Sequence, residues 1–450
     1  MQSLTPDLNN ELKTPLYRQL YTYIKNEIYG GRLAAGTKLP SLRALAASQK
    51  ISITTVGLAY NQLMVEGYIE GREKSGYYVS LSAENDTGHM IYKPPTLKSL
   101  NFNADDERPA YIDTALFDFV KWKKCLNSVI NDYSDMLITP ASPRGEAALR
   151  NQIANYLYMT RGLVSDPDQI IIAAGTQMIS NLAATFLKKV GLKSLSYEDP
   201  GYLPSVNVFR DRGFDVFPVN IGEKGVSIDE IRSIAPSVIS VSPSNQFPLG
   251  MVMPVSERMS LLKYAEENDC IIIEDDYAAE LRYFGRPVPP LKSLDKADRV
   301  LYLGSFSSLL FPSLKISYMI IPERFLGVSE EVMKSYNQTC SKTEQLALAT
   351  YIQRGLLHTH VKKLRKLYSQ KMEFAAECLT DVFGDSLEIS SRDSGLNMVL
   401  EMGRDLARKG ENAGPGESFC RAAAEVGLNM VPLNDFSTKK EDNNAYKVVF

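Results

Sequence analysis

The stretch QIIIAAGTQMISNLAATFLKKV, residues 169–190, decides the fold of most of this chain, because a run of β-branched residues leads directly into a helical pattern. The apolar run is continuous, which is typical of a strand buried on both faces of a sheet. Further runs follow as SVISVSP, CIIIEDD, RVLYLGS and LKISYMIIP, separated by helical stretches. The pattern predicts a mostly parallel sheet covered by helices on both faces, the α/β class.

Residues suited to binding phosphate follow two of these runs. In α/β sheets, ligands bind where the strands end. Gly175 and Thr176 follow the first run at a helix start, where free amides and a hydroxyl can hold a phosphate. Ser305 ends the run RVLYLGS, and Lys315 nearby adds a cation. We therefore expect an anion site at this edge of the sheet.

A carboxylate and a phenol follow the run CIIIE. Asp275 at this strand end can pair with a protonated ring nitrogen, and Tyr277 can donate a hydrogen bond to a ring oxygen. A structural salt bridge between Asp275 and Arg282 explains the same carboxylate equally well. The run therefore leaves two interpretations open, a site for a heteroaromatic ligand and a structural ion pair.

The first eighty residues predict three helices. An apolar residue at every fourth position marks a helix over about 15–29, and Ser41 and Ser52 can cap two short helices that follow it. Two short helices joined by a tight turn are the geometry that inserts the second helix into the major groove of DNA. The pattern therefore predicts a helix-turn-helix.

The segment YIEGREKSGYYVS, residues 68–80, predicts a β-hairpin that serves as a wing. Two β-prone runs flank a turn that carries Arg72, Lys74 and Gly76, and these residues can approach phosphates or the minor groove. A solvated surface turn is the alternative. Residues 1–80 carry a net charge of +3 and the remainder −6, which suits DNA contact confined to the N-terminal part.

The run PLYRQLYTYIKNEIYGGRLAAGTKLPSLRALAASQKISITTVGLAYNQLMVEGYIEGREKSGYYV, residues 15–79, resembles the winged-helix domain of the GntR family. The resemblance implies that DNA is contacted by Arg43, Ser52, Thr54, Thr55 and Tyr60. The family usually has Arg directly after the residue numbered Ser52, whereas this chain has Ile53. That difference removes a phosphate or base contact and predicts an atypical affinity or operator.

With SPRGEAALRNQIANYLYMTRGL, AAGTQ, EDPGY, PSNQFPLG, IIIEDDYAAELRY, GSFSSLLFPSLKISYMIIP and HVKKLRKLY, the whole chain resembles the MocR subfamily of GntR regulators. The resemblance implies a winged helix-turn-helix of α+β type over residues 1–80, a linker over 81–110, and an α/β domain over 111–450. That last domain is expected to have the fold of the fold-type I aminotransferases that depend on pyridoxal phosphate, and to sense an effector and dimerise.

The resemblance assigns a cofactor pocket residue by residue. Gly175, Thr176 and Ser305 are expected at the phosphate, Tyr202 against the ring, Asp275 at the ring nitrogen and Tyr277 at the ring oxygen. Three further positions differ from the family pattern: Asn245 stands where the family often has His, Lys315 replaces an Arg that clamps phosphate, and Lys447 replaces a C-terminal Arg that binds a substrate carboxylate. A lysine offers one point charge in place of a bidentate fork, so recognition is weakened but not lost.

Ser308 is the difference that matters most for chemistry. The resemblance places there the lysine that carries the cofactor as a Schiff base, and a serine hydroxyl cannot form an imine. We therefore expect no catalytic residue and no covalent cofactor, with pyridoxal phosphate or pyridoxamine phosphate bound reversibly at most. Lys315 lies seven positions further on and is not expected to take over, because imine formation needs near-contact geometry.

Composition excludes several classes of protein. The apolar fraction of 44% and the charged fraction of 23% are ordinary for a soluble globular protein, and no uncharged apolar stretch is long enough to cross a membrane. Five scattered cysteines without a CxxC pair argue against a disulfide framework and a zinc site. We expect a cytoplasmic protein with no metal and no membrane partner.

Three functions compete on the sequence alone. The first is a homodimeric transcription regulator that binds paired half-sites of double-stranded DNA and responds to a small amino compound or to the free cofactor. The second is an aminotransferase that carries a DNA-binding module, which Ser308 opposes, because transamination needs a lysine for imine exchange and proton transfer. The third is a dimeric repressor without a ligand.

Overall fold

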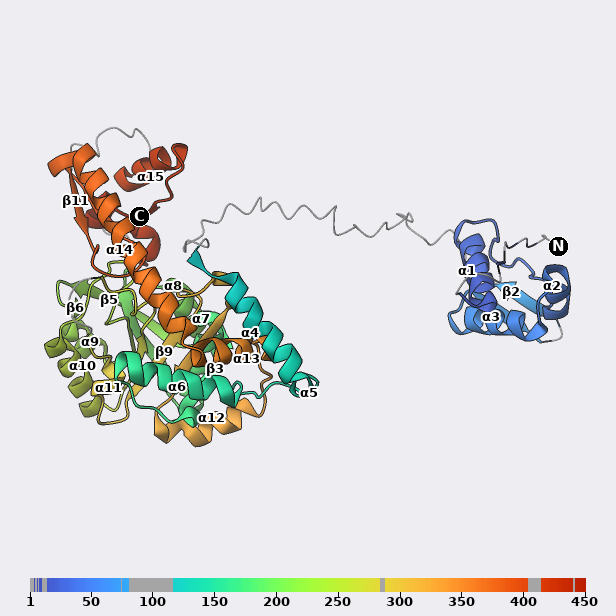
Figure 1. Ribbon diagram of the computed structural model, residues 1–450, viewed down its shortest axis with the longest axis horizontal. Helices are drawn as coiled ribbons and strands as arrows, with labels where there is room; N and C mark the ends of the chain where they lie inside the picture. Colours follow the sequence, from blue (N-terminus) through green and yellow to red (C-terminus); the bar gives the residue numbers. More distant parts are fainter. Residues whose placement is uncertain are drawn as a thin grey trace. The chain divides into compact units, whose positions relative to one another are not determined.

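The computed structural model describes two compact units, Met1–Glu107 and Arg108–Phe450, which Figure 1 shows as ribbons. The described residues are Leu4, Pro6, Leu8, Asn9, 14–73, 75–80, 116–283, 288–403, 414–439 and 442–450. The linker predicted at 81–110 and the wing residue Lys74 lie outside them. None of the helices described here is long and apolar enough to cross a membrane.

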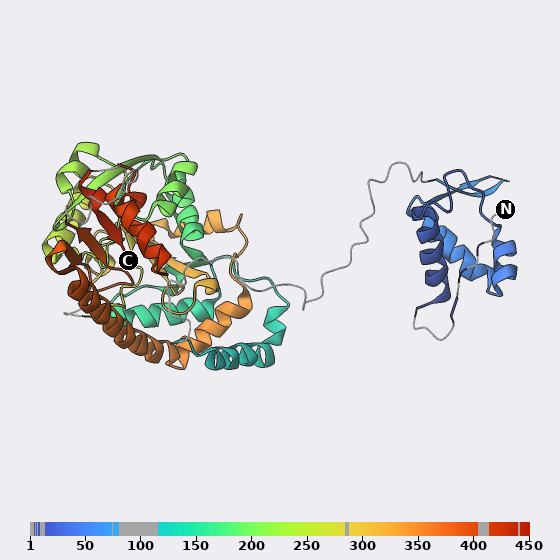
Figure 2. The same ribbon diagram turned by 90° about the horizontal axis from the view of Figure 1, so that it is seen from above.

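The N-terminal unit is a helix-turn-helix followed by a hairpin, as predicted (Figure 2). Its elements are α1 (Leu16–Tyr29), α2 (Leu42–Gln49), α3 (Ile53–Val65), β1 (Ile69–Arg72) and β2 (Gly76–Val79). The two serines begin their helices as expected: Ser41 Oγ accepts from the amide of Ala44 at 3.2 Å, and Ser52 Oγ from that of Thr55 at 3.0 Å. The apolar face of each helix is buried in one shared core.

The large unit is built on a mixed eight-stranded sheet. Its strands lie in the order β3 (Ile170–Ala174), β10 (Ile316–Ile320), β9 (Val300–Ser305), β8 (Ile271–Asp275), β7 (Val238–Val241), β4 (Ser194–Asp199), β5 (Asp215–Gly222) and β6 (Gly225–Val226). Within this sheet β10 is antiparallel to β3 and β9, and β6 is antiparallel to β5. The other pairs are parallel, so the predicted, mostly parallel sheet is confirmed.

Helices cover this sheet and extend beyond it (Figure 1). They are α4 (Phe119–Asp132), α5 (Ser134–Leu137), α6 (Ala147–Arg161), α7 (Gly175–Lys189), α8 (Leu203–Asp211), α9 (Ile228–Ile234), α10 (Val255–Glu267), α11 (Leu291–Leu294), α12 (Leu326–Met333), α13 (Lys342–Gln353), α14 (Leu356–Phe383) and α15 (Pro415–Glu425). A second, antiparallel sheet has the order β11 (Leu387–Ser390), β12 (Val399–Met402), β14 (Lys447–Val449), β13 (Val431–Pro432). It packs with α14 and α15 around its own small core.

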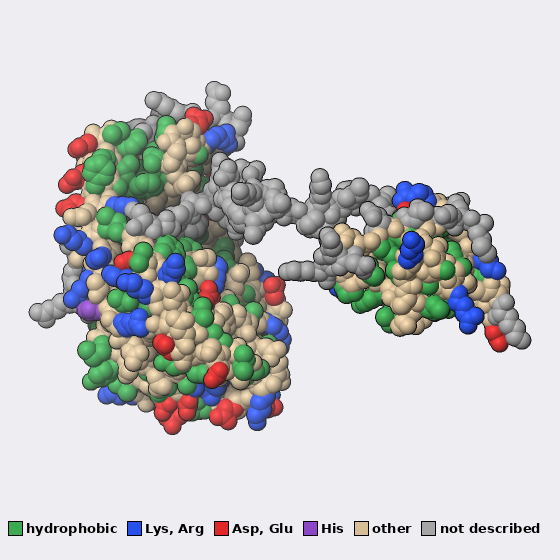
Figure 3. Space-filling view, turned by 45° about the vertical axis from the view of Figure 1, so that its right-hand side comes forward, with side chains coloured by type: hydrophobic (Ala, Val, Ile, Leu, Met, Phe, Trp, Pro, Cys, Tyr) green, Lys and Arg blue, Asp and Glu red, His purple; other side chains and the backbone are tan. Residues whose placement is uncertain are grey.

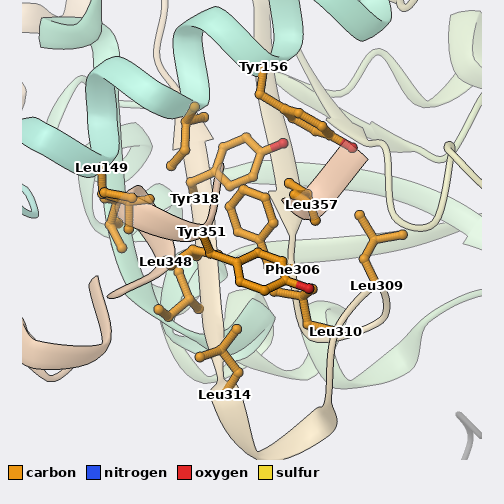
Figure 4. Packing of buried hydrophobic residues seen from close by; sticks show 14 of the residues in the cluster. Leu149, Tyr156, Phe306, Leu309, Leu310, Leu314, Tyr318, Leu348, Tyr351 and Leu357 are labelled. Carbon is orange, nitrogen blue, oxygen red and sulfur yellow. The ribbon is translucent and has the colours of Figure 1, made fainter. Parts of the chain in front are cut away.

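The largest core fixes the loop that follows β9. Figure 4 shows Phe306, Leu309 and Leu310 of this loop packed among Tyr318 and Tyr351. All five side chains are almost fully buried. Because the loop is anchored on both sides of residues 307 and 308, the two serines at these positions are held in place at the end of β9.

Candidate functional site

Strand register brings the strand ends next to Gly175, Ser305 and Asp275 to one edge of the large sheet. Ile316 lies opposite Ala174, Ser317 opposite Ser305, and Leu303 opposite Asp275. The ends of β3, β9 and β8 are therefore neighbours in space, and the loops that follow them meet.

Groups that could bind a phosphate lie near the N-terminus of α7. Gly175 has a left-handed φ of +81°, and a Cβ placed on it would lie 3.6 Å from Lys315 Cδ. The lysine stem therefore runs beside the first turn of α7, where Thr176 is half-buried. Ser305 Oγ accepts a hydrogen bond from Ser317 Oγ at 3.0 Å. Free amides, hydroxyls and one cation at a helix start suit a dianion.

The ring end of the site is acidic. Burial and the neighbouring charge of Asp276 raise the pKa of Asp275 to about 7. Burial raises the pKa of Glu198 to about 8, although Glu198 accepts a hydrogen bond from the amide of Ser242 at 3.0 Å. Both carboxylates line a cavity between the sheet and α7 and α8, together with Tyr202. A cationic group in this cavity would hold the carboxylates in their charged form.

Asp276, directly after this strand end, forms a buried ion pair with Arg161. Arg161 donates to both carboxylate oxygens of Asp276 at 3.0 Å, and the hydroxyl of Tyr302 donates to the same carboxylate at 2.7 Å. The pair is nearly inaccessible to solvent, so it fixes the chain next to Asp275.

Four buried polar atoms near these strand ends have no hydrogen-bond partner among the described residues. They are Asn245 Nδ2, Tyr277 Oη, Ser307 Oγ and Ser308 Oγ, from the segments that follow β7, β8 and β9. A buried polar atom without a partner costs about 1–3 kcal/mol. Their occurrence after three adjacent strands fits a polar ligand that would satisfy them, so the residues present fit a pyridoxal-type cofactor.

Aromatic side chains border the site. The ring of Phe247 lies 6.0 Å from the rings of Tyr202 and Tyr277 and 5.1 Å from that of Phe436, centroid to centroid. Tyr202 is 40% exposed just before α8, so its ring can still meet a ligand. Phe247 links the ends of β4, β7 and β8 and was not predicted from the sequence.

Lys447 lies on a different sheet from the strands that carry Ser305 and Asp275. It lies on β14 of the small sheet, where its Nζ is 3.2 Å from Glu401 Oε2 on the neighbouring strand. Its ammonium group therefore already contacts a carboxylate within the chain, and its assignment to the pocket stays a prediction.

The predicted DNA-binding residues lie around α2, α3 and the hairpin. Arg43 and Thr54 are exposed, and the hydroxyls of Ser52 and Thr55 are 2.8 Å apart at the start of α3. Arg72 forms an ion pair with Glu70 at 2.7 Å, and Gly76 has a φ of +112° in the hairpin.

Tyr60 is a correction. Its side chain is fully buried, and its hydroxyl donates to the carbonyl of Pro40 at 3.0 Å. A side chain enclosed in the core of the unit cannot contact DNA. Tyr60 instead holds α3 against the segment before α2, and its ring packs edge-on against Tyr77 of the hairpin at 5.0 Å.

These features define a two-part protein, a winged helix-turn-helix unit and an α/β unit built on a large mixed sheet. The family described as "Bacterial regulatory proteins, gntR family" matches residues 16–79, and "Aminotransferase class I and II" matches residues 119–443. The chain therefore belongs to the GntR-type transcription regulators that carry an aminotransferase class I and II domain.

Individual relatives agree with this assignment. The chain is 38% identical to the uncharacterized HTH-type transcriptional regulator YdeL of Bacillus subtilis, over 89% of this chain and 86% of the relative. It is 32% identical to the probable rhizopine catabolism regulatory protein MocR of Rhizobium meliloti, over 95% and 88%. The kynurenine aminotransferase of Pyrococcus horikoshii superposes with a TM-score of 0.65 over 80% of this chain and 93% of that one, at 22% identity, which shows the shared fold alone.

Proposed function

We propose that the aminotransferase-like domain is a non-catalytic sensor. In this proposal, residues 111–450 reversibly bind pyridoxal phosphate, pyridoxamine phosphate or a small amino compound, and dimerise. Binding would change the separation of two DNA-binding heads, residues 1–80. The observation that carries the proposal is Ser308, whose buried hydroxyl has no hydrogen-bond partner among the described residues and lies where the family resemblance expects a lysine amine.

The residues at the strand ends have distinct roles in such a site. The amides of Gly175 and Thr176, with Ser305 and Lys315, would hold the phosphate. Asp275 would accept a hydrogen bond from a protonated ring nitrogen, and Tyr277 would donate one to the ring oxygen. When bound, the cofactor supplies an aldehyde or an amine on an electron-poor ring. Ser308 can hydrogen-bond to that group but cannot form a carbon–nitrogen bond with it.

Two arms test reversible binding. In the first, calorimetric titration of the full chain with pyridoxal phosphate and with pyridoxamine phosphate measures affinity, and dialysis should remove the ligand. In the second, borohydride reduction followed by peptide mapping should find no pyridoxyl adduct on the natural chain. A Ser308→Lys variant should gain an adduct at position 308, whereas Ser313→Lys, an exposed position in the same loop, should not.

Any of three results would contradict the sensor. An adduct on Lys315 of the natural chain, or transamination by the purified protein, would support an enzyme. An absence of heat and of thermal shift with both cofactor forms would support the dimeric repressor without a ligand.

We also propose that the chain acts as a homodimer on paired half-sites of DNA. Large apolar side chains remain exposed on or next to the first helices of the large unit: Phe119, Val120, Ile130, Tyr133, Met136, Ile138, Tyr158 and Met159. Their burial against a second copy would remove apolar surface from water. Sedimentation should give twice the chain mass, and footprinting should protect two half-sites; a single short footprint would contradict the pairing.

A further inference from the structure

The solvent-facing side of α3 carries no charge. Residues 53–65 contain no Lys, Arg, Asp or Glu. Ile53 and Leu58 are 51% and 50% exposed, and Thr54 and Asn61 are exposed beside them. Guanine is read mainly by Arg or Lys, so α3 itself lacks the side chains for that contact. An apolar group on the DNA is the better match for this surface.

Gly57 lies in the middle of this face. Glycine is less favourable than alanine in the interior of a helix. Gly57 has helical backbone geometry, and a Cβ placed on it would meet no heavy atom within 4 Å in the described part of the chain. Neither crowding nor backbone conformation therefore requires glycine at this position. Glycine would be required if another molecule approached α3 closely at this position.

We propose that Ile53, Gly57 and Leu58 form an apolar surface that reads thymine methyl groups in the major groove. The thymine C5-methyl is the apolar group that base pairs present there, and Asn61 can bond to the N6 and N7 atoms of adenine. Gly57 leaves room for the closest approach of the duplex. The proposal rests on the DNA binding of the N-terminal unit and adds that the half-sites are rich in A·T pairs at the positions facing α3.

Removal of the methyl groups tests this contact directly. Duplexes selected from random DNA with the full chain are remade with deoxyuridine in place of thymidine. Each contacted methyl group should contribute about fourfold in affinity. For the thymine that Leu58 contacts, Leu58→Ala should reduce the loss of affinity caused by deoxyuridine to less than about twofold. Val65→Ala is the matched control, because Val65 is 88% exposed at the far end of α3, where base contacts are not expected.

Gly57→Ala gives a second, independent readout. The added methyl group should slow hydrogen exchange in α3 of the full chain, because it stabilises the helix. The same change should weaken binding to the selected duplex by at least about fivefold, because it fills the gap. A loss of affinity together with a more stable helix cannot be explained by misfolding.

Several outcomes would overturn the proposal. G·C-rich half-sites whose affinity does not change with deoxyuridine would indicate reading by another element. If Gly57→Ala binds the selected duplex with unchanged affinity, the duplex does not approach α3 closely at Gly57. If Leu58→Ala alters the sedimenting mass and not the DNA affinity, the face pairs two copies of the chain. If the natural chain selects no duplex at all, DNA binding itself fails, which is a distinct result.

Discussion

Asp275→Asn should stabilise the ligand-free large unit at neutral pH and leave it unchanged at low pH. Burial and the charge of Asp276 raise the pKa of Asp275 from 3.8 to about 7. The folded state therefore holds this proton over a range in which the unfolded chain has released it. Because the unfolded state binds fewer protons there, stability falls as pH rises from about 4 and levels off above about 7.

The pKa difference sets the size of the effect. A rise from 3.8 to about 7 corresponds to about 4 kcal/mol of lost stability above pH 7. Asp275 is only partly buried, so solvent lowers this figure, and we expect about 2–4 kcal/mol. Asparagine has nearly the same shape and never ionises, so the variant should avoid that loss.

Trp122 makes the measurement specific to the large unit. It is the single tryptophan of the chain and is buried against the core of the large unit. Urea unfolding of the natural chain and of Asp275→Asn is followed by the fluorescence of Trp122 at several pH values between about 4.5 and 8.5. The free energies of unfolding of the two proteins should diverge as pH rises. With pyridoxal phosphate at pH 8, the natural chain should instead be more stable than Asp275→Asn, because only the carboxylate pairs with a protonated ring nitrogen. A difference that does not vary with pH, or a variant less stable than the natural chain at every pH, would refute the reasoning.

Three further changes test the parts that support the two sites. Arg161→Met should destabilise the large unit by about 3–5 kcal/mol, because it leaves the Asp276 carboxylate buried without its partner; urea unfolding checks this. Gly145→Ala should be destabilising or fail to fold, since φ is +99° and the new Cβ would lie 2.6 Å from Ile172, and the soluble yield and thermal midpoint measure the loss. Ser52→Ala should remove the cap of α3 and about 1 kcal/mol of stability in the N-terminal unit, measured by hydrogen exchange in α3.

The sequence predicted the helices and strands whose apolar residues form one clear pattern. The strands β3, β7, β8, β9 and β10 contain continuous apolar runs, and all five were predicted. Strand β4 reads SLSYED and contains no β-branched residue, so nothing in the sequence marked its end as a strand end. Glu198, on that strand, was missed for this reason. Strand direction could not be predicted either, because the apolar run of β10 has the same pattern as the runs of β3 and β9, to which β10 is antiparallel.

Two residue assignments show why the transfer of roles needs the structure. The resemblance placed Tyr60 at DNA, whereas its side chain is buried in the core of the N-terminal unit. Lys447 matches a position that binds a carboxylate in the family, and here it meets the carboxylate of Glu401 within the chain. Tyr60 donates a hydrogen bond and Lys447 pairs with a carboxylate, but in each case the partner lies within the protein.

The serine at position 308 is consistent with the way a concentration sensor must work. A ligand shifts an equilibrium between two arrangements only by its difference in affinity for them, and its effect grows with free concentration. At a hundredfold excess over the dissociation constant, a reversible ligand stabilises the state it prefers by about 2.7 kcal/mol. A ligand held through an imine would leave more slowly when its concentration fell, because the carbon–nitrogen bond must first be hydrolysed. A pocket that retains hydroxyl, amide and carboxylate contacts, with a serine in place of the attaching lysine, would therefore let occupancy follow supply.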